Sequence, residues 1–116
     1  MSDFYCDEVL NGKTPVEVVF ESDTVLAFHH TQPSYSTHIV VIPKRHIPSL
    51  LHLTPEDAPV VIEMMQVILQ TAAGIVAETG ACRVVTNLGN YQESQHLHWH
   101  LISTQAGKSE EEQAET

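Results

Sequence analysis

The feature that most constrains this chain of 116 residues is an alternating stretch at residues 95–102, which reads QHLHWHLI. Successive side chains of a β-strand point to opposite faces, so a spacing of two places His96, His98 and His100 on one face. The apolar residues between them would occupy the other face, where a core can cover them. We therefore predict a strand over residues 93–103 whose three imidazoles serve one ligand, either a phosphate group or a metal ion.

The rest of the chain predicts a sheet with one long and one short helix. Short apolar or β-branched runs bounded by turn residues indicate four further strands, at residues 16–20, 24–28, 37–42 and 81–86. A turn-rich loop separates the last of these from the histidine strand, which favours a hairpin. The short helix is predicted at residues 3–10. This order of elements is typical of an α+β fold with a mostly antiparallel sheet of about five strands.

The long helix is predicted to end at Thr79, because Gly80 follows it as a stop signal. Thr54 and Pro55 form a good helix start, unless the regular helix begins only at Pro59. Apolar residues cover most of its surface and leave only a narrow polar stripe. One sheet face does not cover so wide an apolar surface, so we expect the helix to pack against a second copy of the chain in a homodimer.

Length and charge limit the possible partners and location. The length fits one domain, predicted at residues 1–105 and followed by an acidic disordered tail at residues 106–116. The formal net charge is −10, from 15 Asp and Glu against 5 Lys and Arg. Because affinity for nucleic acid depends on basic residues at phosphates, we expect no nucleic-acid partner. With no uninterrupted apolar run of about 18–20 residues and no signal pattern, we expect no membrane association and a cytoplasmic location.

The histidine strand is compatible with three kinds of site. Neutral imidazoles bind zinc, iron or copper, but three on one strand span roughly 13 Å, so a single ion would need His38 from another strand. Alternatively, one histidine attacks phosphorus while the others handle protons and charge, since an unperturbed pKa of about 6.5 leaves neutral imidazole available at pH 7. The third kind is a binding module with the same pocket and no turnover. The spacing alone leaves all three open.

These residues resemble the histidine-triad (HIT) family, whose motif is His-φ-His-φ-His-φ-φ, where φ is apolar. Residues 96–102 fit this motif at every position. Other parts of the chain are similar to the family's remaining blocks in the same order, at residues 25–28, 37–46, 84–87 and 92. The resemblance covers roughly residues 4–103 and is strongest to the compact Hint-like branch.

The resemblance implies a HIT-like fold that dimerises into one continuous sheet, and chemistry at the α-phosphate of a nucleotide. The substrate would be a purine nucleoside phosphoramidate, an aminoacyl-adenylate-type compound or a dinucleoside polyphosphate. His98 would attack phosphorus and form a nucleotidyl-histidine intermediate, which water then cleaves. His100 and His38 would hold the phosphate and shuttle the leaving-group proton, and His96 would orient the nucleophile.

The same resemblance assigns the substrate contacts to Phe28, His30, Thr31, Asn87 and Gln92. Phe28 would belong to the base pocket, and Asn87 and Gln92 would contact the sugar and phosphate. His30 stands where the family carries a ribose-binding acid, and Glu93 stands where Ser or Thr is common. We therefore expect the sugar and leaving-group contacts of this chain to differ from the family pattern.

No cofactor is required for this chemistry. Bacterial relatives often carry an N-terminal Cys-x-x-Cys that holds a structural zinc ion together with the residue matching His46 and a histidine of the triad strand. In this chain Cys6 remains, but Asp3 takes the position of the other cysteine. The sequence therefore disfavours a structural zinc, and we assign no metal ligand from it.

Overall fold

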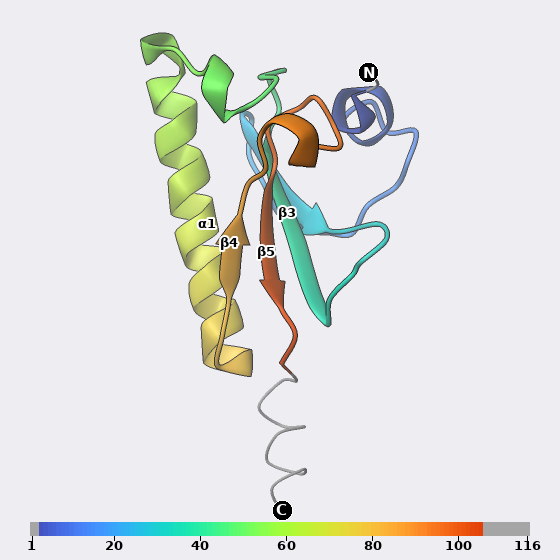
Figure 1. Cartoon of the computed structure of the whole chain (residues 1–116), viewed down its shortest axis with the longest axis vertical. Helices are drawn as coiled ribbons and strands as arrows, with labels where there is room; N and C mark the ends of the chain where they lie inside the picture. The colour runs from blue at the N-terminus through green and yellow to red at the C-terminus, as the bar shows by residue number, and fades with distance from the viewer. Residues whose placement is uncertain (1–2, 106–116) are drawn as a thin grey trace, which may run out of the picture.

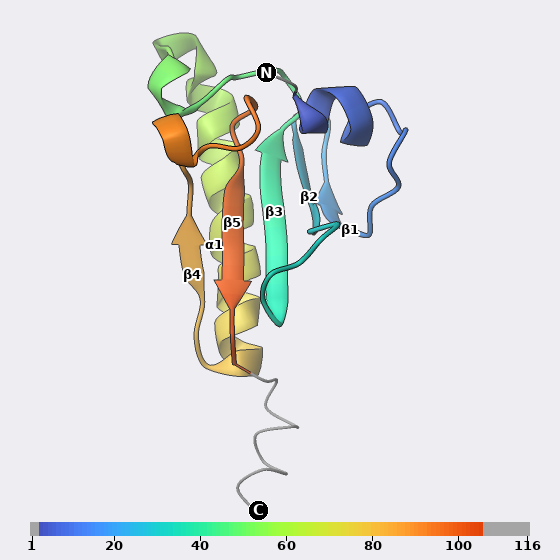
Figure 2. The ribbon, with the colours of Figure 1, turned by 45° about the vertical axis from the view of Figure 1, so that its right-hand side comes forward.

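Five antiparallel strands form one sheet in the computed structural model, which describes residues 3–105 (Figure 1). They are β1 (Val18–Glu21), β2 (Val25–His29), β3 (Thr37–Pro43), β4 (Arg83–Val85) and β5 (Trp99–Ser103). The order across the sheet is β1-β2-β3-β5-β4, so β5 lies between β3 and β4 (Figure 2). The predicted α+β fold, its five strands and the β4–β5 hairpin are confirmed. The tail predicted at residues 106–116 lies outside the described residues.

One long helix, α1 (Ala58–Thr79), covers one face of the sheet (Figures 1 and 2). Pro59 lies in its first turn, where the missing N–H removes no helical hydrogen bond. Gly80 ends the helix with a φ of 93°, in the left-handed region that glycine adopts without strain. Single helical turns lie at Tyr5–Val9, Leu50–His52, Pro55–Asp57 and Gly89–Tyr91. The regular helix thus begins just before Pro59, one turn after the first predicted start.

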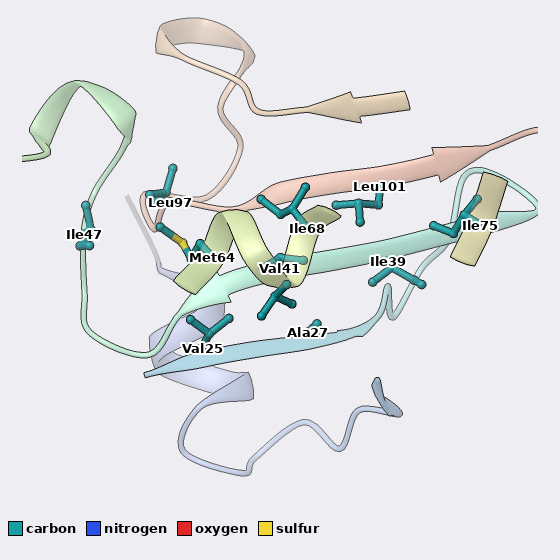
Figure 3. Packing of buried hydrophobic residues seen from close by; sticks show 11 residues of the cluster. Val25, Ala27, Ile39, Val41, Ile47, Met64, Ile68, Ile75, Leu97 and Leu101 are labelled. Carbon is teal, nitrogen blue, oxygen red and sulfur yellow. The ribbon is translucent and has the colours of Figure 1, made fainter. Parts of the chain in front are cut away.

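The main core lies between α1 and the sheet (Figure 3). Side chains alternate along each strand, so every second residue of β2, β3 and β5 faces the helix. Leu101 of the histidine stretch is one of them, as the alternation predicts. The core residues drawn from these strands and from α1 are Val25, Ala27, Ile39, Val41, Met64, Val67, Ile68, Ile75 and Leu101.

The opposite face of the sheet is covered only in part. The N-terminal turn Tyr5–Val9 packs on it and closes a second, smaller core. That core comprises Tyr5, Val9, Leu26, Phe28, Val40 and Ile42. His38 and His100 belong to the same face, because His38 lies two residues from Val40 and His100 is directly opposite Val40. This face therefore holds the candidate site.

The strand predicted at residues 93–103 is shorter than expected, because β5 begins only at Trp99. The last paired residues are Val41 and Trp99, so continuing the register would place Pro43 opposite Leu97. Proline has no N–H to donate to the ladder. The N–H of Leu97 bonds instead to the carbonyl oxygen of Ile47 at 2.6 Å. Residues 93–98 are therefore irregular, and His96 and His98 lie before the strand rather than in it.

The outer surface of α1 remains apolar in the isolated chain. Ile62, Leu69 and Val76 are exposed and recur every seven residues, which places them in one stripe along the helix. The stretch Pro55–Thr79 is long and apolar enough to cross a membrane by length and composition. Its inner face, however, forms the main core. We therefore treat α1 as a packing element, and the homodimer stays a prediction.

Candidate active site

A cavity of about 680 Å³ lies against the open part of the sheet. His38 of β3 and His100 of β5 line it, and His98 joins them from the segment just before β5. His30 reaches the cavity from the end of β2, and Tyr5 reaches it from the N-terminal turn. Segments that are far apart in the sequence thus bring four imidazoles to one cavity.

Hydrogen bonding determines which ring nitrogen of His98 is free. Its Nδ1 donates to the carbonyl oxygen of His96 at 2.7 Å. Because a carbonyl oxygen can only accept, Nδ1 carries the proton and Nε2 of the neutral ring keeps its lone pair. The ring is buried beside that of Tyr5, with the two ring centroids 4.9 Å apart. The lone pair of Nε2 can attack an electrophile, so His98 meets the requirement for a nucleophile.

His38 and His100 form a hydrogen-bonded pair on adjacent strands. The main-chain N–H of Ser34 donates to Nδ1 of His38 at 3.2 Å, so neutral His38 carries its proton on Nε2. This Nε2 donates to Nδ1 of His100 at 2.9 Å. Neutral His100 therefore carries its proton on Nε2. One main-chain amide thus sets the tautomers of both rings, and His100 is left with an N–H to offer a ligand.

Burial lowers the pKa of the histidines around the cavity. Burial, aided by the charge of His30, lowers the pKa of His38 to about 4. Burial and repulsion from the neighbouring imidazoles lower the pKa of His100 to about 4 as well. Burial also lowers the pKa of His98, against the hydrogen bond to His96, which acts to raise it. These rings are therefore neutral at pH 7, and the ring of His98 carries no charge there.

His96 does not face the cavity with the other two triad histidines. Its ring is fully buried, and its Nε2 donates to the carbonyl oxygen of Pro43 at 2.7 Å. His96 keeps the predicted face, because its ring lies beside Tyr5 of the N-terminal turn that packs on this face, and Leu97 packs into the main core on the other side. Its ring lies outside the cavity, in contact with Asp3 and Cys6. Its contribution next to the cavity is its carbonyl oxygen, which holds the ring of His98.

A cluster of four residues around the His96 ring has the composition of a metal site. Nδ1 of His96 lies 3.2 Å from Sγ of Cys6 and 3.1 Å from the carboxylate of Asp3. Sγ of Cys6 lies 3.5 Å from Nδ1 of His46. These separations of 3.1–3.5 Å lie at or just below the roughly 3.3–3.8 Å between ligand atoms around a tetrahedral zinc ion. Because Nε2 of His96 donates to Pro43, its Nδ1 has the lone pair that a metal requires.

Only some of the predicted substrate contacts lie at the cavity. His30, Thr31 and Asn87 line it. Phe28 is 1% exposed and lies in the smaller core rather than in the cavity wall. The side-chain amide of Gln92 donates to two main-chain carbonyl oxygens, at 2.6 and 2.8 Å, and holds the segment before β5. The structure does not place Phe28 or Gln92 at the cavity surface.

Several lining residues are absent from the sequence-based site. Arg83 of β4 lies opposite Ile102, and so on the same face as His38. The register of the predicted hairpin is the signal that would have identified it, because opposed residues of antiparallel strands share a face. Tyr5 and Tyr91 come from single helical turns, and no sequence pattern links them to the histidines. Glu93 is the one acid among the described residues that line the cavity.

Comparison with known proteins agrees with this geometry. A family model described as "Scavenger mRNA decapping enzyme C-term binding" matches residues 4–115. Protein HitA of Neisseria gonorrhoeae is 32% identical over 91 residues, which cover 78% of this chain and 85% of HitA. An uncharacterized HIT-like protein of Synechococcus elongatus is 34% identical over 100 residues, covering 82% of this chain and 84% of that protein.

Solved structures show the same relationship. A HIT family hydrolase from Legionella pneumophila superposes with a TM-score of 0.77 at 28% identity, covering 88% of this chain and 92% of that chain. A histidine triad protein from Clostridium difficile superposes with a TM-score of 0.74 at 33% identity, covering 86% and 88%. The relationship to the Legionella hydrolase supports the class of the protein as a hydrolase in general. Within that class, the chain belongs to the histidine-triad (HIT) family.

Proposed function

We propose that this chain cleaves the α-phosphate linkage of purine nucleoside phosphoramidates or dinucleoside polyphosphates through a nucleotidyl-histidine intermediate. The observation that carries the proposal is the free Nε2 of His98, which the bond from Nδ1 to His96 leaves unprotonated beside the His38–His100 pair. A neutral nucleophile next to donors for a phosphate oxygen is the arrangement that displacement at phosphorus requires.

The first step forms a bond between Nε2 of His98 and the α-phosphorus. The electron pair comes from Nε2, and the bond from phosphorus to the leaving nitrogen or oxygen breaks with its electrons going to the leaving group. The proton for the leaving group comes from the His38–His100 pair. An anionic phosphate beside the pair raises its pKa, so the pair takes up one proton when substrate binds and gives it up here.

The second step returns His98 to its starting state. Water attacks phosphorus, the P–Nε2 bond breaks with its electrons returning to the ring, and the proton of water goes to the His38–His100 pair. The products are a nucleoside monophosphate and the protonated leaving group. One well-placed donor at a developing oxyanion contributes roughly 2.7–4 kcal/mol, and a placed acid or base contributes about 10²–10⁴ in rate. His100 and Asn87 are the residues in the cavity that we assign to these donor roles.

We also infer that Asp3, Cys6, His46 and His96 hold a divalent ion such as zinc. The single remaining cysteine argues against zinc on sequence alone, whereas the convergence of four ligand atoms argues for it. The ion would fasten the N-terminal turn to the segment before β5 as a structural crosslink. The reaction steps above use no metal, in line with the expectation that none is required for the chemistry.

We propose that the protein acts in the cytoplasm as a homodimer, with no nucleic-acid or membrane partner. The exposed stripe Ile62, Leu69 and Val76 on α1 supports the dimer, because a second copy would cover it. The acidic net charge of −10 supports the absence of a nucleic-acid partner.

An assay with adenosine phosphoramidate tests the activity. We expect wild-type chain to release adenosine monophosphate, and His98→Asn to retain the fold and lose turnover. Equal turnover by both proteins would overturn the role of His98.

Glu93, an acid in the cavity, is the observation that favours the alternative of a nucleotide-binding regulatory module. Tight binding of the monophosphate with no turnover of any phosphoramidate would select that alternative.

A further inference from the structure

His30 is held in a defined position at the cavity. Its main-chain N–H donates to the carbonyl oxygen of His38 at 2.8 Å, which ties the end of β2 to β3. Its ring stacks on the ring of His38, with the centroids 4.2 Å apart and the planes 20° apart. The position of the ring is therefore set by the sheet as well as by the loop that follows β2.

The hydrogen bonds of His30 make it a donor toward a ligand. Its Nδ1 accepts the main-chain N–H of Gln32 at 3.0 Å. A main-chain N–H can only donate, so the neutral ring carries its proton on Nε2 and has no acceptor left. A carboxylate at this position would offer acceptors only. The sugar hydroxyls of a nucleotide need acceptors for their protons, and His30 supplies none.

A second imidazole donor lies close by. His100 also carries its proton on Nε2, and its ring centroid is 6.1 Å from that of His30. A phosphate group that accepts N–H···O bonds of about 2.7–2.9 Å can bridge donors at this spacing. Arg83 adds a fixed positive charge to the cavity wall, while Glu93, an exposed loop residue, adds the opposing negative charge.

The same rings are close enough to hold a metal ion, since His30, His38 and His100 each place one ligand atom within 4.8 Å of the others. Nδ1 of both His30 and His38 already accepts a main-chain N–H, so a metal would have to bind at Nε2. Those two nitrogens carry protons in the neutral rings. To bind a metal at Nε2, each ring would have to carry its proton on Nδ1, and this would break the two main-chain hydrogen bonds. An oxyanion accepts the protons on Nε2 and leaves both bonds intact.

We propose that His30 makes this cavity select substrates with a second phosphate group near the α-phosphate over substrates recognised through a free ribose diol. The inference rests on the proposed function, because it places the α-phosphate at His98. The second phosphate is either the next group of a polyphosphate chain or one carried on the sugar, and both present the same acceptor oxygens. Among the proposed substrates, dinucleoside polyphosphates meet this requirement and simple phosphoramidates do not.

Calorimetric titration of the full chain with four non-reacting ligands tests the selection. The ligands are adenosine 5′-monophosphate, its 2′,3′-dideoxy analogue, the α,β-methylene analogue of adenosine 5′-diphosphate, whose P–C–P link this reaction does not cleave, and adenosine 3′,5′-bisphosphate. We expect wild type to bind one of the two-phosphate ligands about tenfold more tightly than the monophosphate, in line with charge-assisted hydrogen bonds. Which of the two binds more tightly distinguishes the chain phosphate from the sugar phosphate. Removing the diol is expected to change the affinity by less than about twofold.

Two substitutions of His30 and one control assign the effect to this side chain. His30→Ala is expected to lose the preference for a second phosphate, and His30→Asp is expected to reverse it and to make binding depend on the diol. His29→Asp is the control, because His29 is exposed and belongs to the face of the sheet opposite the cavity. It introduces the same charge one residue away and is expected to bind like wild type. A thermal melt of each variant confirms that it folds.

Two results would overturn the inference. The first is that wild type binds the monophosphate at least as tightly as both two-phosphate ligands, and the second is that it loses about tenfold in affinity when the diol is removed. If either result is obtained while the monophosphate binds tightly, the proposed function still holds and only the role of His30 is disproved. Failure of all four ligands to bind contradicts the proposed function itself and the inference with it.

Discussion

His98 donates its Nδ1–H to the carbonyl oxygen of His96 across 2.7 Å, although the two imidazole rings lie in different surroundings. The ring of His98 faces the cavity, whereas the ring of His96 is buried in the cluster with Asp3, Cys6 and His46. The two sites are therefore joined through a main-chain atom rather than through a shared ligand. A disturbance of the cluster would reach the ring of His98 by moving that carbonyl oxygen.

The metal cluster makes a prediction that is independent of activity. Wild-type chain purified without chelator is expected to hold about one zinc ion per chain, as four-ligand structural sites do. Cys6→Ala is expected to lose the ion and to melt at a lower temperature, because the N-terminal turn is no longer fastened. Cys82→Ala removes the other free thiol and is expected to keep the metal. Elemental analysis with equal metal in Cys6→Ala and wild type would disprove the ligand set.

Stability is expected to fall as the pH drops from about 6.5 to 4. His38 and His100 have a pKa of about 4 in the folded chain, below the value of roughly 6.5 when unfolded. Between these values the unfolded chain binds more protons, so their contribution is complete above about pH 6.5 and is lost toward pH 4. After allowance for partial exposure, the loss is on the order of 1–3 kcal/mol for the coupled pair.

Urea denaturation between pH 7 and 4.5 measures this loss. Replacing both residues, as His38→Asn with His100→Asn, is expected to reduce the slope of stability against pH. His29→Asn is the matched control, because it removes an exposed imidazole outside the cavity. A wild-type chain equally stable across the whole range would show that these histidines do not lose protonation on folding.

Phosphate binding is expected to draw a proton onto the His38–His100 pair. Both rings are neutral at pH 7 in the free chain, and an adjacent anion favours the charged form. Calorimetry with adenosine monophosphate in buffers of different ionisation enthalpy reports the number of protons taken up. Adenosine, which has no phosphate, serves as the control ligand. Binding of the monophosphate with no proton uptake near pH 7 would contradict the assigned source of the leaving-group proton.

If the exposed stripe on α1 forms the dimer interface, one charged residue placed in the stripe is expected to dissociate the dimer. Leu69→Glu places a carboxylate in the centre of the stripe, where a partner would have to bury it, so we expect a monomer in light scattering at micromolar concentration. Gln70→Glu introduces the same charge at an exposed residue about 100° around the helix from Leu69, and it is expected to remain dimeric. A wild-type chain with the mass of one protomer would contradict the homodimer.

The alternation of histidines and apolar residues correctly predicted the face of each side chain where β5 is paired with β3. Leu101 faces α1 and His100 faces the cavity, as a period of two requires. The predicted extent of the strand failed before Trp99, because Pro43 on the neighbouring strand cannot pair with Leu97. That failure depends on a register between two distant segments, which the spacing within one strand does not reveal.

Site residues whose function follows from the chemistry of the side chain could be predicted from the sequence. Residues whose position depends on tertiary packing could be predicted less well. His98 is identified by its type and spacing and His38 by its type and the family resemblance, and both line the cavity. Phe28 and Gln92 have suitable side chains, but neither is available to a ligand. Phe28 packs in the smaller core, and the amide of Gln92 donates to two main-chain carbonyl oxygens. The convergence of Asp3 with His96 requires the N-terminal turn to cross the sheet, which no local pattern in the sequence indicates.

The central claim is that Nε2 of His98 bonds to the α-phosphorus during the reaction. The most direct test is mass spectrometry of the chain after rapid mixing with adenosine phosphoramidate and quenching in alkaline denaturant, followed by peptide mapping. We predict an adenylyl group on His98 of the wild-type chain and on that of His29→Asn, and none on His98→Asn. Product that accumulates with no adduct on wild type, or an adduct located on a different residue, would contradict the mechanism.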